Sequence, residues 1–423
     1  MNDTNKEKTG NVPTLRFPRF CGEWERIKAA DLLDFFSTNS LSWEQLEYGG
    51  ENILNLHYGL IHNGLPTHIN LDESPLPSIK SEFKPRKYTI CKEGDVAFAD
   101  ASEDTNDVGK VVEFTNCADR EVVCGLHTIH GRDKLGKTIP GFKGYAFSSF
   151  AFHNQIRRIA QGTKIFSINT GNFEEVFISI PNKEEQKKIA TFLSLIDRRI
   201  SIQNKVIERY ESLIRAIILR SQSSSATRKM YLRELLTERK ELNAQGYDIC
   251  SVSVSRGVVN QVEYLGRSFA AKETAHYHVV HKGDIIYTKS PTGEFPYGII
   301  KQNYMDTPVA VSPLYGVYEP IDYLTGVYLH HFFCSPQNAK NYLRRLIQKG
   351  AKNTINITNQ HFLDNYISIP ASNALKGIVA SIEILSLRVD LEKRLLSTYA
   401  KQKAFLLSNL FIANVPIKCN TFS

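Results

Sequence analysis

The chain repeats short passages at one fixed distance, and this duplication constrains its fold more than any other feature. FISIP at 177–181 returns as YISIP at 366–370, and KEGDV at 92–96 returns as HKGDI at 281–285. Both pairs are offset by 189 residues. Such a period is too long for a solenoid repeat, so the chain is predicted to contain two copies of one folding module.

A third match lies between these anchors. RRIAQGTK (157–164) resembles RRLIQKGAK (344–352), with small gaps that cancel further along the chain. Each fragment alone is weak evidence, because Gly-Asp turns and strands that end at proline are common. Their shared order and spacing favour duplication over chance similarity.

A long amphipathic segment follows the proline that ends each copy of the ISIP strand. Its apolar residues alternate in steps of four and three over four heptads, the spacing of a coiled coil. The predicted helix–helix residues are Ile189, Leu193, Ile196, Ile200, Ile207, Tyr210 and Ile214 in the first copy, and Ile378, Ile382, Leu385, Val389, Leu396 and Tyr399 in the second. A helix over 183–220 would be roughly 57 Å long.

Two arrangements are open for these helices. They can pair with each other as an antiparallel coiled coil, which gives the chain a pseudo-twofold internal repeat, or each can pack on its own globular domain. Four unbroken heptads exceed what one small domain covers, which favours the coiled coil.

The Ser-rich segment SQSSSATR at 221–228 marks the seam between the copies. The predicted layout is a first module at 1–182, a first helix at 183–222, a second module at 223–371 and a second helix at 372–412. Short β-rich stretches and helical pieces, separated by Gly, Pro and Asp turns, make the predicted fold class α+β for both modules.

Composition narrows the class of protein. With 42% apolar and 23% charged residues, the chain can bury a core in each module. It contains no run of roughly 20 apolar residues and no apolar signal-peptide core near its amino terminus, so we expect a cytoplasmic protein with no membrane partner. A net charge of +8 is compatible with nucleic-acid binding.

Motifs for catalysis are missing. The sequence contains no phosphate-binding loop, no dinucleotide fingerprint, no H-E-x-x-H and no G-x-S-x-G. Seven cysteines form no C-x-x-C pair, and the histidines in HTIHGRD (127–133) and HYHVVH (276–281) have no identifiable third ligand. We therefore expect neither catalytic residues nor a metal site in this chain.

The duplicated arrangement and the helices that follow a proline resemble the specificity (S) subunit of type I restriction-modification systems over essentially the whole chain. In that family, P-x-x-E-Q followed by an isoleucine opens a conserved helix. Here Glu185 and Gln186 occupy those places, one residue further from Pro181 than usual. The second copy departs from the pattern, with Ala374 and Leu375 instead.

The resemblance implies that the two modules are target recognition domains, each reading one half of a bipartite, asymmetric site on double-stranded DNA. The helices would set the spacing and dock two methyltransferase (M) subunits, and restriction/translocase (R) subunits would join. S-adenosylmethionine, ATP and Mg would act in those partners, with no cofactor in this chain and no catalysis by it alone. Two rival readings are a coiled-coil adaptor that binds no DNA and a nuclease or methyltransferase that acts alone.

Candidate DNA-binding residues follow from the chemistry of the ligand. Lys and Arg on exposed loops contact phosphates, and Arg, Lys, Asn and Gln reach base edges. In the first module the candidates are Lys84, Arg86, Lys87, Arg132, Lys134, Lys137, Lys143, Arg157, Arg158 and Lys164. In the second module they are Lys289, Ser290, Thr292, Arg344, Arg345, Lys349, Lys352 and Asn353.

Overall fold

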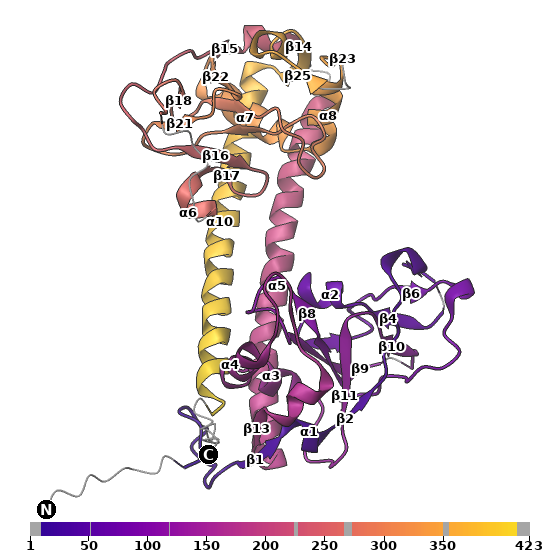
Figure 1. The fold of residues 1–423 in the computed structure, drawn as a ribbon. Coiled ribbons are helices and arrows are strands. Elements are labelled where there is room, and N and C mark those ends of the chain that lie inside the picture. Colours follow the sequence, from indigo (N-terminus) through magenta and orange to yellow (C-terminus); the bar gives the residue numbers. More distant parts are fainter. Residues whose placement is uncertain are drawn as a thin grey trace, which may run out of the picture. The chain divides into compact units, whose positions relative to one another are not determined.

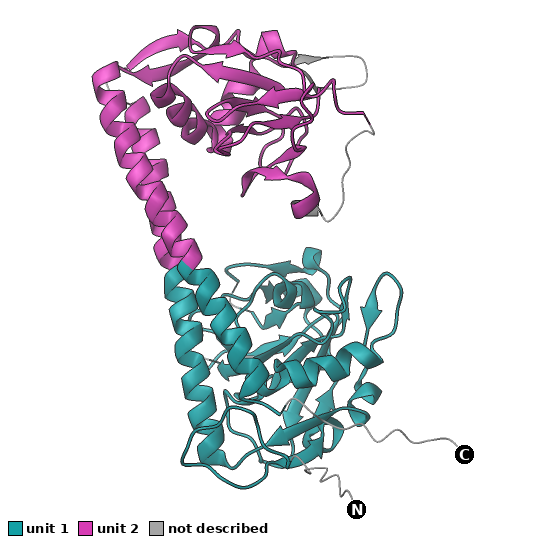
Figure 2. Cartoon of the chain, turned by 90° about the vertical axis from the view of Figure 1, so that its left-hand side faces the viewer, with its two compact units in different colours: residues 1–203, 395–423 teal, residues 204–394 magenta. Residues whose placement is uncertain are grey.

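The chain divides into two compact units (Figure 2). Unit 1 comprises Met1–Gln203 and Leu395–Ser423, and unit 2 comprises Asn204–Arg394. Each unit therefore takes one part of both long helices. The computed structural model describes residues 10–50, 52–117, 119–223, 227–265, 273–349 and 355–412.

Unit 1 is built on a five-stranded sheet of order β2-β11-β7-β9-β5, in which only the β5–β9 pair is parallel. Figure 1 labels three of these strands, β2, β9 and β11. Its strands are β2 (Leu33–Phe36), β11 (Thr128–Asp133), β7 (Val96–Ala99), β9 (Val111–Asn116) and β5 (His68–Asn70). A second sheet has the order β10-β4-β6-β3, with β10 (Val122–Cys124), β4 (Leu54–Leu56), β6 (Ser78–Ile79) and β3 (Leu46–Glu47). The short pair β8 (Ala101–Ser102) and β12 (Phe166–Ser167) and the helices α1 (Ala29–Leu32), α2 (Tyr58–His62), α3 (Lys143–Phe147) and α4 (Phe150–Ile159) complete the unit. Phe98, Phe147, Phe152 and Phe173 pack ring against ring in its core.

Unit 2 contains a four-stranded antiparallel sheet of order β15-β22-β19-β20. Its strands are β15 (Leu236–Glu238), β22 (Gly316–Pro320), β19 (Ile285–Tyr287) and β20 (Ile300–Gln302). Three short pairs are β16 (Cys250–Ser253) with β17 (Gly257–Asn260), β18 (His278–Val280) with β21 (Val309–Val311), and β23 (Gln348–Lys349) with β24 (Ile355–Asn356). The helices of this unit's globular part are α6 (Gln261–Leu265), α7 (Tyr323–Phe333), α8 (Pro336–Arg344) and α9 (Asn359–Phe362).

Four strands of the main sheet have the same order in both units, and β5 of unit 1 is an additional fifth strand. Strands β11, β7 and β9 of unit 1 follow one another as β22, β19 and β20 do in unit 2. The ISIP strands also match: β13 (Phe177–Ile180) pairs with β1 (Glu25–Lys28), and β25 (Tyr366–Pro370) pairs with β14 (Thr227–Tyr231), both antiparallel. The sequence repeat is therefore a repeat of sheet topology.

The repeated Gly-Asp step has a backbone cause. Gly94 and Gly283 have φ of +85° and +95°, a region in which a side chain is disfavoured. In each turn a carboxylate oxygen of the following residue, Asp95 or Asp284, accepts a 2.8 Å hydrogen bond from the N–H three residues earlier. Both carboxylates are buried, so each needs a counter-charge.

An arginine supplies that charge in each unit. Arg132 donates to Asp95 from Nε and Nη2 at 2.7 and 2.6 Å, and Arg239 donates to Asp284 at 2.7 and 3.1 Å. The two arginines come from different places in their sheets: Arg132 lies in β11 of unit 1, and Arg239 directly follows β15 of unit 2. The duplication thus preserves the ion pair but not the position of its cation.

The long helices are α5 (Lys183–Gln222) and α10 (Ser372–Asn409). The side chain of Asn182 caps α5 by accepting the N–H of Glu185 at 2.9 Å. Gln186 is completely buried, where it donates to the carbonyl oxygens of Lys137 and Pro181 and accepts the N–H of Ile139. The Glu-Gln step therefore anchors the start of α5 to unit 1.

Contacts join the two helices within each unit. In unit 1, Leu193 of α5 and Leu406 of α10 belong to one core, and Asp197 lies 2.6 Å from Lys403. In unit 2, Lys393 donates to Glu211 at 2.8 Å. All thirteen residues named from the heptad spacing are buried or half-buried. Within the described ranges, the helices are too short or too polar to span a bilayer.

Candidate nucleic-acid interface

A basic patch surrounds two tyrosines on the β14–β25 pair of unit 2. Tyr231 and Tyr366 are direct cross-strand partners, with ring centroids 6.0 Å apart. Lys229 and Arg345 lie over the Tyr366 ring at 5.1 and 5.5 Å, and Arg233 lies over Tyr231 at 4.3 Å. Cations beside aromatic faces are the combination that proteins use to hold a phosphate backbone and stack on bases.

Unit 1 carries a counterpart on β1 and β13. The guanidinium of Arg26 lies 4.0 Å from the ring centroid of Phe177. Arg26 pairs with Ser179 in the ladder, as Lys229 pairs with Ser368 in unit 2. The cation–aromatic contact is therefore duplicated in the same strand register.

The repeated arginine pair lies at the end of a helix in each unit. Arg157 and Arg158 are exposed in the last turn of α4, and Arg344 and Arg345 are exposed at the end of α8. A basic side chain at this position also interacts favourably with the negative end of the helix dipole. These four residues, with Arg26, Lys229 and Arg233, are called the paired basic patches below.

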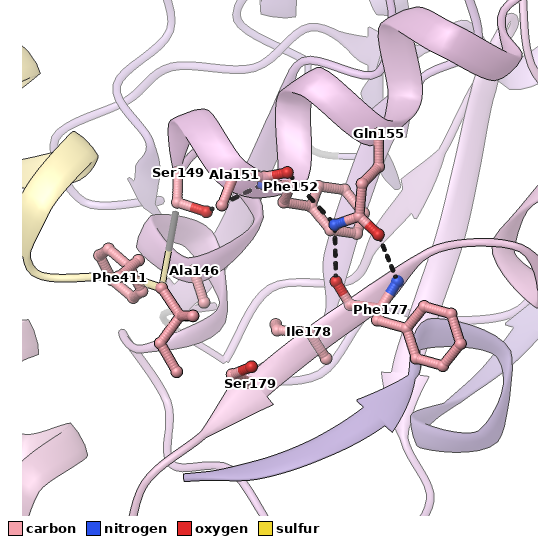
Figure 3. Close-up of a pocket in the computed structure, with 10 residues that line it drawn as sticks. Ala146, Ser149, Ala151, Phe152, Gln155, Phe177, Ile178, Ser179 and Phe411 are labelled. Carbon is pink, nitrogen blue, oxygen red and sulfur yellow. Dashed lines mark hydrogen bonds between the residues drawn. The ribbon is translucent and has the colours of Figure 1, made fainter. Parts of the chain in front are cut away.

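The side chain of Gln155 fixes α4 against β13 (Figure 3). Its Nε2 donates to the carbonyl oxygen of Phe177 at 2.9 Å, and its Oε1 accepts the Phe177 N–H at 2.9 Å. In unit 2, Asn365 performs a related task by donating to the carbonyl oxygen of Tyr342 in α8 at 2.8 Å. Both arginine pairs are thus held beside the ISIP strand.

Three further candidates lie on an exposed segment of unit 1. Lys84, Arg86 and Lys87 follow the short 3-10 helix Ser81–Phe83, and none of the three forms an ion pair with a described residue. Lys164 is exposed after α4. These cations are accessible to a phosphate backbone.

The segment 132–137 is used internally. Arg132 holds Asp95, as described above, and Lys134 donates to the carbonyl oxygen of Ala30 at 3.0 Å. Lys137 forms an ion pair with Glu25. The structure gives these three candidates intramolecular partners.

Lys143 lies in the interior of unit 1. Its Nζ donates to Thr138 Oγ1 at 2.9 Å and lies 3.5 Å from a carboxylate oxygen of Glu113. The same carboxylate accepts the N–H of Gly144 at the start of α3. Lys143 therefore neutralises a buried carboxylate and does not reach the surface.

The remaining unit 2 candidates differ in exposure. Ser290 and Thr292 are exposed, whereas Lys289 is half-buried, and burial lowers its pKa. Lys349 belongs to β23, but its side chain is not described; Lys352 and Asn353 lie outside the described residues.

Two cavities lie within single units. The cavity in Figure 3 lies between α4, β13 and the segment after α10, and holds about 20 Å³, room for about one water. A groove of about 380 Å³ in unit 2 is lined by residues including Arg256, Lys301, Gln302, Tyr304 and His330. The buried Oε1 of Gln302 has no hydrogen-bond partner among the described residues.

Sequence reasoning missed Arg26, Lys229 and Arg233. No motif marks them, because they become neighbours of Phe177, Tyr366 and Tyr231 only through strand pairing and packing. Aligning the strands that pair with FISIP and YISIP, rather than those segments themselves, would have identified Arg26 and Lys229.

Comparison with known proteins gives a family match and a fold match. Residues 118–211 match the family model described as the type I restriction modification DNA specificity domain. The chain has no match among curated proteins. The S subunit of a type I restriction-modification system from M. genitalium is 16% identical, with a TM-score of 0.52 over 95% of this chain and 99% of that one. The HsdS subunit from Thermoanaerobacter tengcongensis is 14% identical, with a TM-score of 0.35 over 93% and 97%.

These findings confirm the resemblance read from the sequence. The family match covers the end of the first module and much of α5, and the fold match extends to nearly the whole chain. Residues 118–211 are therefore similar to the type I restriction modification DNA specificity domain, and the chain has the fold of a type I restriction-modification specificity subunit.

Proposed function

We propose that this chain is the DNA sequence-recognition subunit of a type I restriction-modification complex, and that each unit reads one half of a bipartite site. The observation that carries the proposal is the pair of basic patches, which place a cation over an aromatic ring in the same strand register of both units. Phosphate contacts of this kind fix the register of a protein on DNA, and other side chains of the unit read base edges.

The two halves of the site are expected to differ. Unit 1 has the additional sheet β10-β4-β6-β3, whereas unit 2 has the β16–β17 pair and the groove beside it. Phe177 of unit 1 is replaced by Tyr366 in unit 2. Because the surfaces that would meet base edges are unlike, the target is not a palindrome.

The helices supply the spacing in this proposal. We infer that α5 and α10 form an antiparallel coiled coil, supported by Asp197–Lys403 in unit 1 and Glu211–Lys393 in unit 2. A helix of 40 residues is about 60 Å long, somewhat under two turns of B-DNA. The length of the coiled coil would then set the distance between half-sites.

An apolar stripe on α10 supports docking of methyltransferase subunits. Ile384, Leu387 and Leu391 in unit 2 are 70%, 63% and 47% exposed, and Leu395 in unit 1 is 39% exposed. Their spacing of three, four and four residues places them on one helix face. A helical partner that covers this face would bury it.

Catalysis belongs to the partners in this proposal. Two M subunits would bring S-adenosylmethionine, and R subunits would bring ATP and Mg. The chain itself would recognise the target sequence on double-stranded DNA.

The decisive experiment is to map adenine methylation in cells that carry this chain with its methyltransferase partner. We expect a gapped motif with unlike ends, which substitutions in one unit change at one end only. A contiguous or palindromic motif would contradict the two-reader proposal. Methylation or cleavage by the purified chain alone, given DNA, Mg and S-adenosylmethionine, would reject it in favour of an independent enzyme.

The exposed stripe on α10 also fits a protein-interaction adaptor that binds no DNA. The salt dependence of DNA affinity separates the two functions, because neutralised phosphates release counterions. A DNA reader loses affinity steeply as salt rises. An adaptor shows no affinity even with the methyltransferase partner present.

A further inference from the structure

Three metal-ligating side chains meet in the interior of unit 1. Cys91 precedes the Gly-Asp turn, Cys124 ends β10 and His130 lies in β11. They are 2%, 2% and 0% exposed, and the two sulfur atoms are 3.5 Å apart. One potential ligand atom from each residue lies within 4.8 Å of the other two.

The imidazole of His130 is oriented for coordination. Its Nε2 lies 2.7 Å from Oδ2 of Asp95, which is held in turn by Arg132. Its Nδ1 is buried and has no hydrogen-bond partner in the part of the chain that the structure describes. A metal-bound histidine usually has this environment, with a carboxylate hydrogen-bonded to one ring nitrogen and the other nitrogen left for the metal.

Packing alone does not require these residues. In unit 2, the Val279–Ala310 pair corresponds to the Ile90–Val123 bridge of unit 1. The next residue in each strand is a cysteine in unit 1, but Val280 or Val311 in unit 2.

Both valines belong to the unit 2 core. The residue corresponding to His130 is Val317, because His130 pairs with Ala97 in unit 1 as Val317 pairs with Ile286 in unit 2, and Val317 belongs to the same core. Unit 2 therefore has the same local arrangement of strands without metal-ligating side chains at these positions.

We propose that unit 1 binds one Zn²⁺ ion through Cys91 Sγ, Cys124 Sγ and His130 Nδ1. Thiolate and imidazole donors select a soft or borderline ion over Mg²⁺ and Ca²⁺, which take oxygen ligands. On binding, the two thiols lose their protons to solvent, so two thiolates balance the charge of the ion. Cys117 lies next to the cluster, with its thiol 3.8 Å from the carbonyl oxygen of Cys91.

The site would join the two sheets of unit 1. Cys124 belongs to the four-stranded sheet and His130 to the five-stranded sheet, and Cys91 adjoins the turn that carries Asp95. Metal binding would lock the Asp95–Arg132 pair in place. This inference concerns unit 1 alone and does not depend on the proposed DNA-reading function.

The test is Zn²⁺ binding by the reduced, chelator-treated full chain, measured by competition with a chromophoric chelator. We expect one equivalent to bind, and Co²⁺ in its place to give a thiolate-to-metal charge-transfer band. The test variant is Cys91→Val with Cys124→Val, which copies unit 2 and should fold. It should lose at least about 100-fold in affinity and the charge-transfer band.

Cys250→Ser is the matched control, since Cys250 is an equally buried thiol of unit 2. It should bind the metal as the unaltered chain does. The proposal is overturned if the double valine variant, shown to be folded by circular dichroism, binds Zn²⁺ as tightly as the unaltered chain. It is also overturned if the reduced unaltered chain binds none, or if mass spectrometry of the freshly isolated protein finds a Cys91–Cys124 disulfide without metal.

Discussion

Arg16 donates two hydrogen bonds, at 2.8 and 2.7 Å, to the carboxylate of Glu185, which is completely buried. This pair ties the segment before β1 to the first turn of α5. Removing one partner of a buried pair leaves an uncompensated charge, so Arg16→Ala should lower the free energy of unfolding by about 3–5 kcal/mol. Urea denaturation measures the change. The exposed Arg19 provides the control, and an equal loss in Arg19→Ala would contradict the anchoring role.

The faces of α5 should respond differently to truncation. Leu193 is completely buried and Leu195 is 52% exposed, two positions along the same helix. Leu193→Ala leaves a cavity and should cost about 2–5 kcal/mol, whereas Leu195→Ala should cost about 0.5 kcal/mol or less. The two variants can be compared by urea denaturation. Similar losses from both would show that Leu193 does not face a packed interior.

Two glycines of unit 2 should respond in opposite directions to the same substitution. Gly283 has a φ of +95°, so Gly283→Ala should destabilise the protein by about 1–2 kcal/mol. Gly377 lies inside α10 with no atom within 4 Å of an added Cβ, so Gly377→Ala should stabilise by about 0.5–1 kcal/mol. Urea denaturation of the full chain tests both substitutions. A Gly283→Ala variant that is as stable as the unaltered chain or more stable would contradict the argument from positive φ, and a destabilised Gly377→Ala variant would contradict the argument from the helix.

The arginine pair of unit 2 should contribute to DNA affinity. Replacing Arg344 and Arg345 by alanine should weaken binding across sequences and reduce the salt slope by about 1–2. Affinity is measured over a range of salt concentrations with the methyltransferase partner present. Arg198 and Arg199, an exposed pair on α5, form the charge-matched control. If both double variants lose DNA affinity by the same factor, the loss is due to net charge, and a specific role of Arg344 and Arg345 is contradicted.

Stability should fall in mild acid because of two histidines in α7. Burial lowers the pKa of His330 and His331 from 6.5 to about 3, with Lys301 close by. The unfolded chain takes up protons as the pH falls through 6.5, while the folded chain does not until about pH 3. Stability is therefore complete above pH 6.5 and declines below it, on the order of 2 kcal/mol for each histidine by pH 5.

Denaturation at pH 7 and pH 5, together with hydrogen exchange of the α7 amides, measures this loss. His331→Gln should remove part of the pH dependence, and His276→Gln, at an exposed position, should leave it unchanged. An unaltered pH dependence in His331→Gln would assign the effect to other groups.

The helices were predictable because heptad spacing depends only on local sequence. The repeat and the exposed arginine pairs were also visible, since they recur at a nearly constant offset. Strand order was not predictable. Pairs such as β10–β4 join segments far apart in the chain, and no sequence pattern indicates which strands pair. The internal use of Lys143 depends on Glu113, thirty residues away, and nothing local to either residue predicts it.

The metal-ligating cluster was hidden for a similar reason. Its ligands come from three segments with no fixed spacing, so no motif search would group Cys91 with Cys124 and His130. The sequence led to the expectation of no metal because the cysteines form no C-x-x-C pair. Folding, rather than spacing, brings the donors together.

The duplicated strand pairs have an evolutionary consequence. Because β13 and β25 pair with β1 and β14 in the same antiparallel register, the same backbone ladder precedes each long helix. Genetic recombination at the DNA that encodes these strands would join the globular part of another such protein to α5 or α10 of this one. The backbone ladder before the helix would stay intact. If each unit reads one half-site, as proposed above, a single exchange would give a new combination of half-sites.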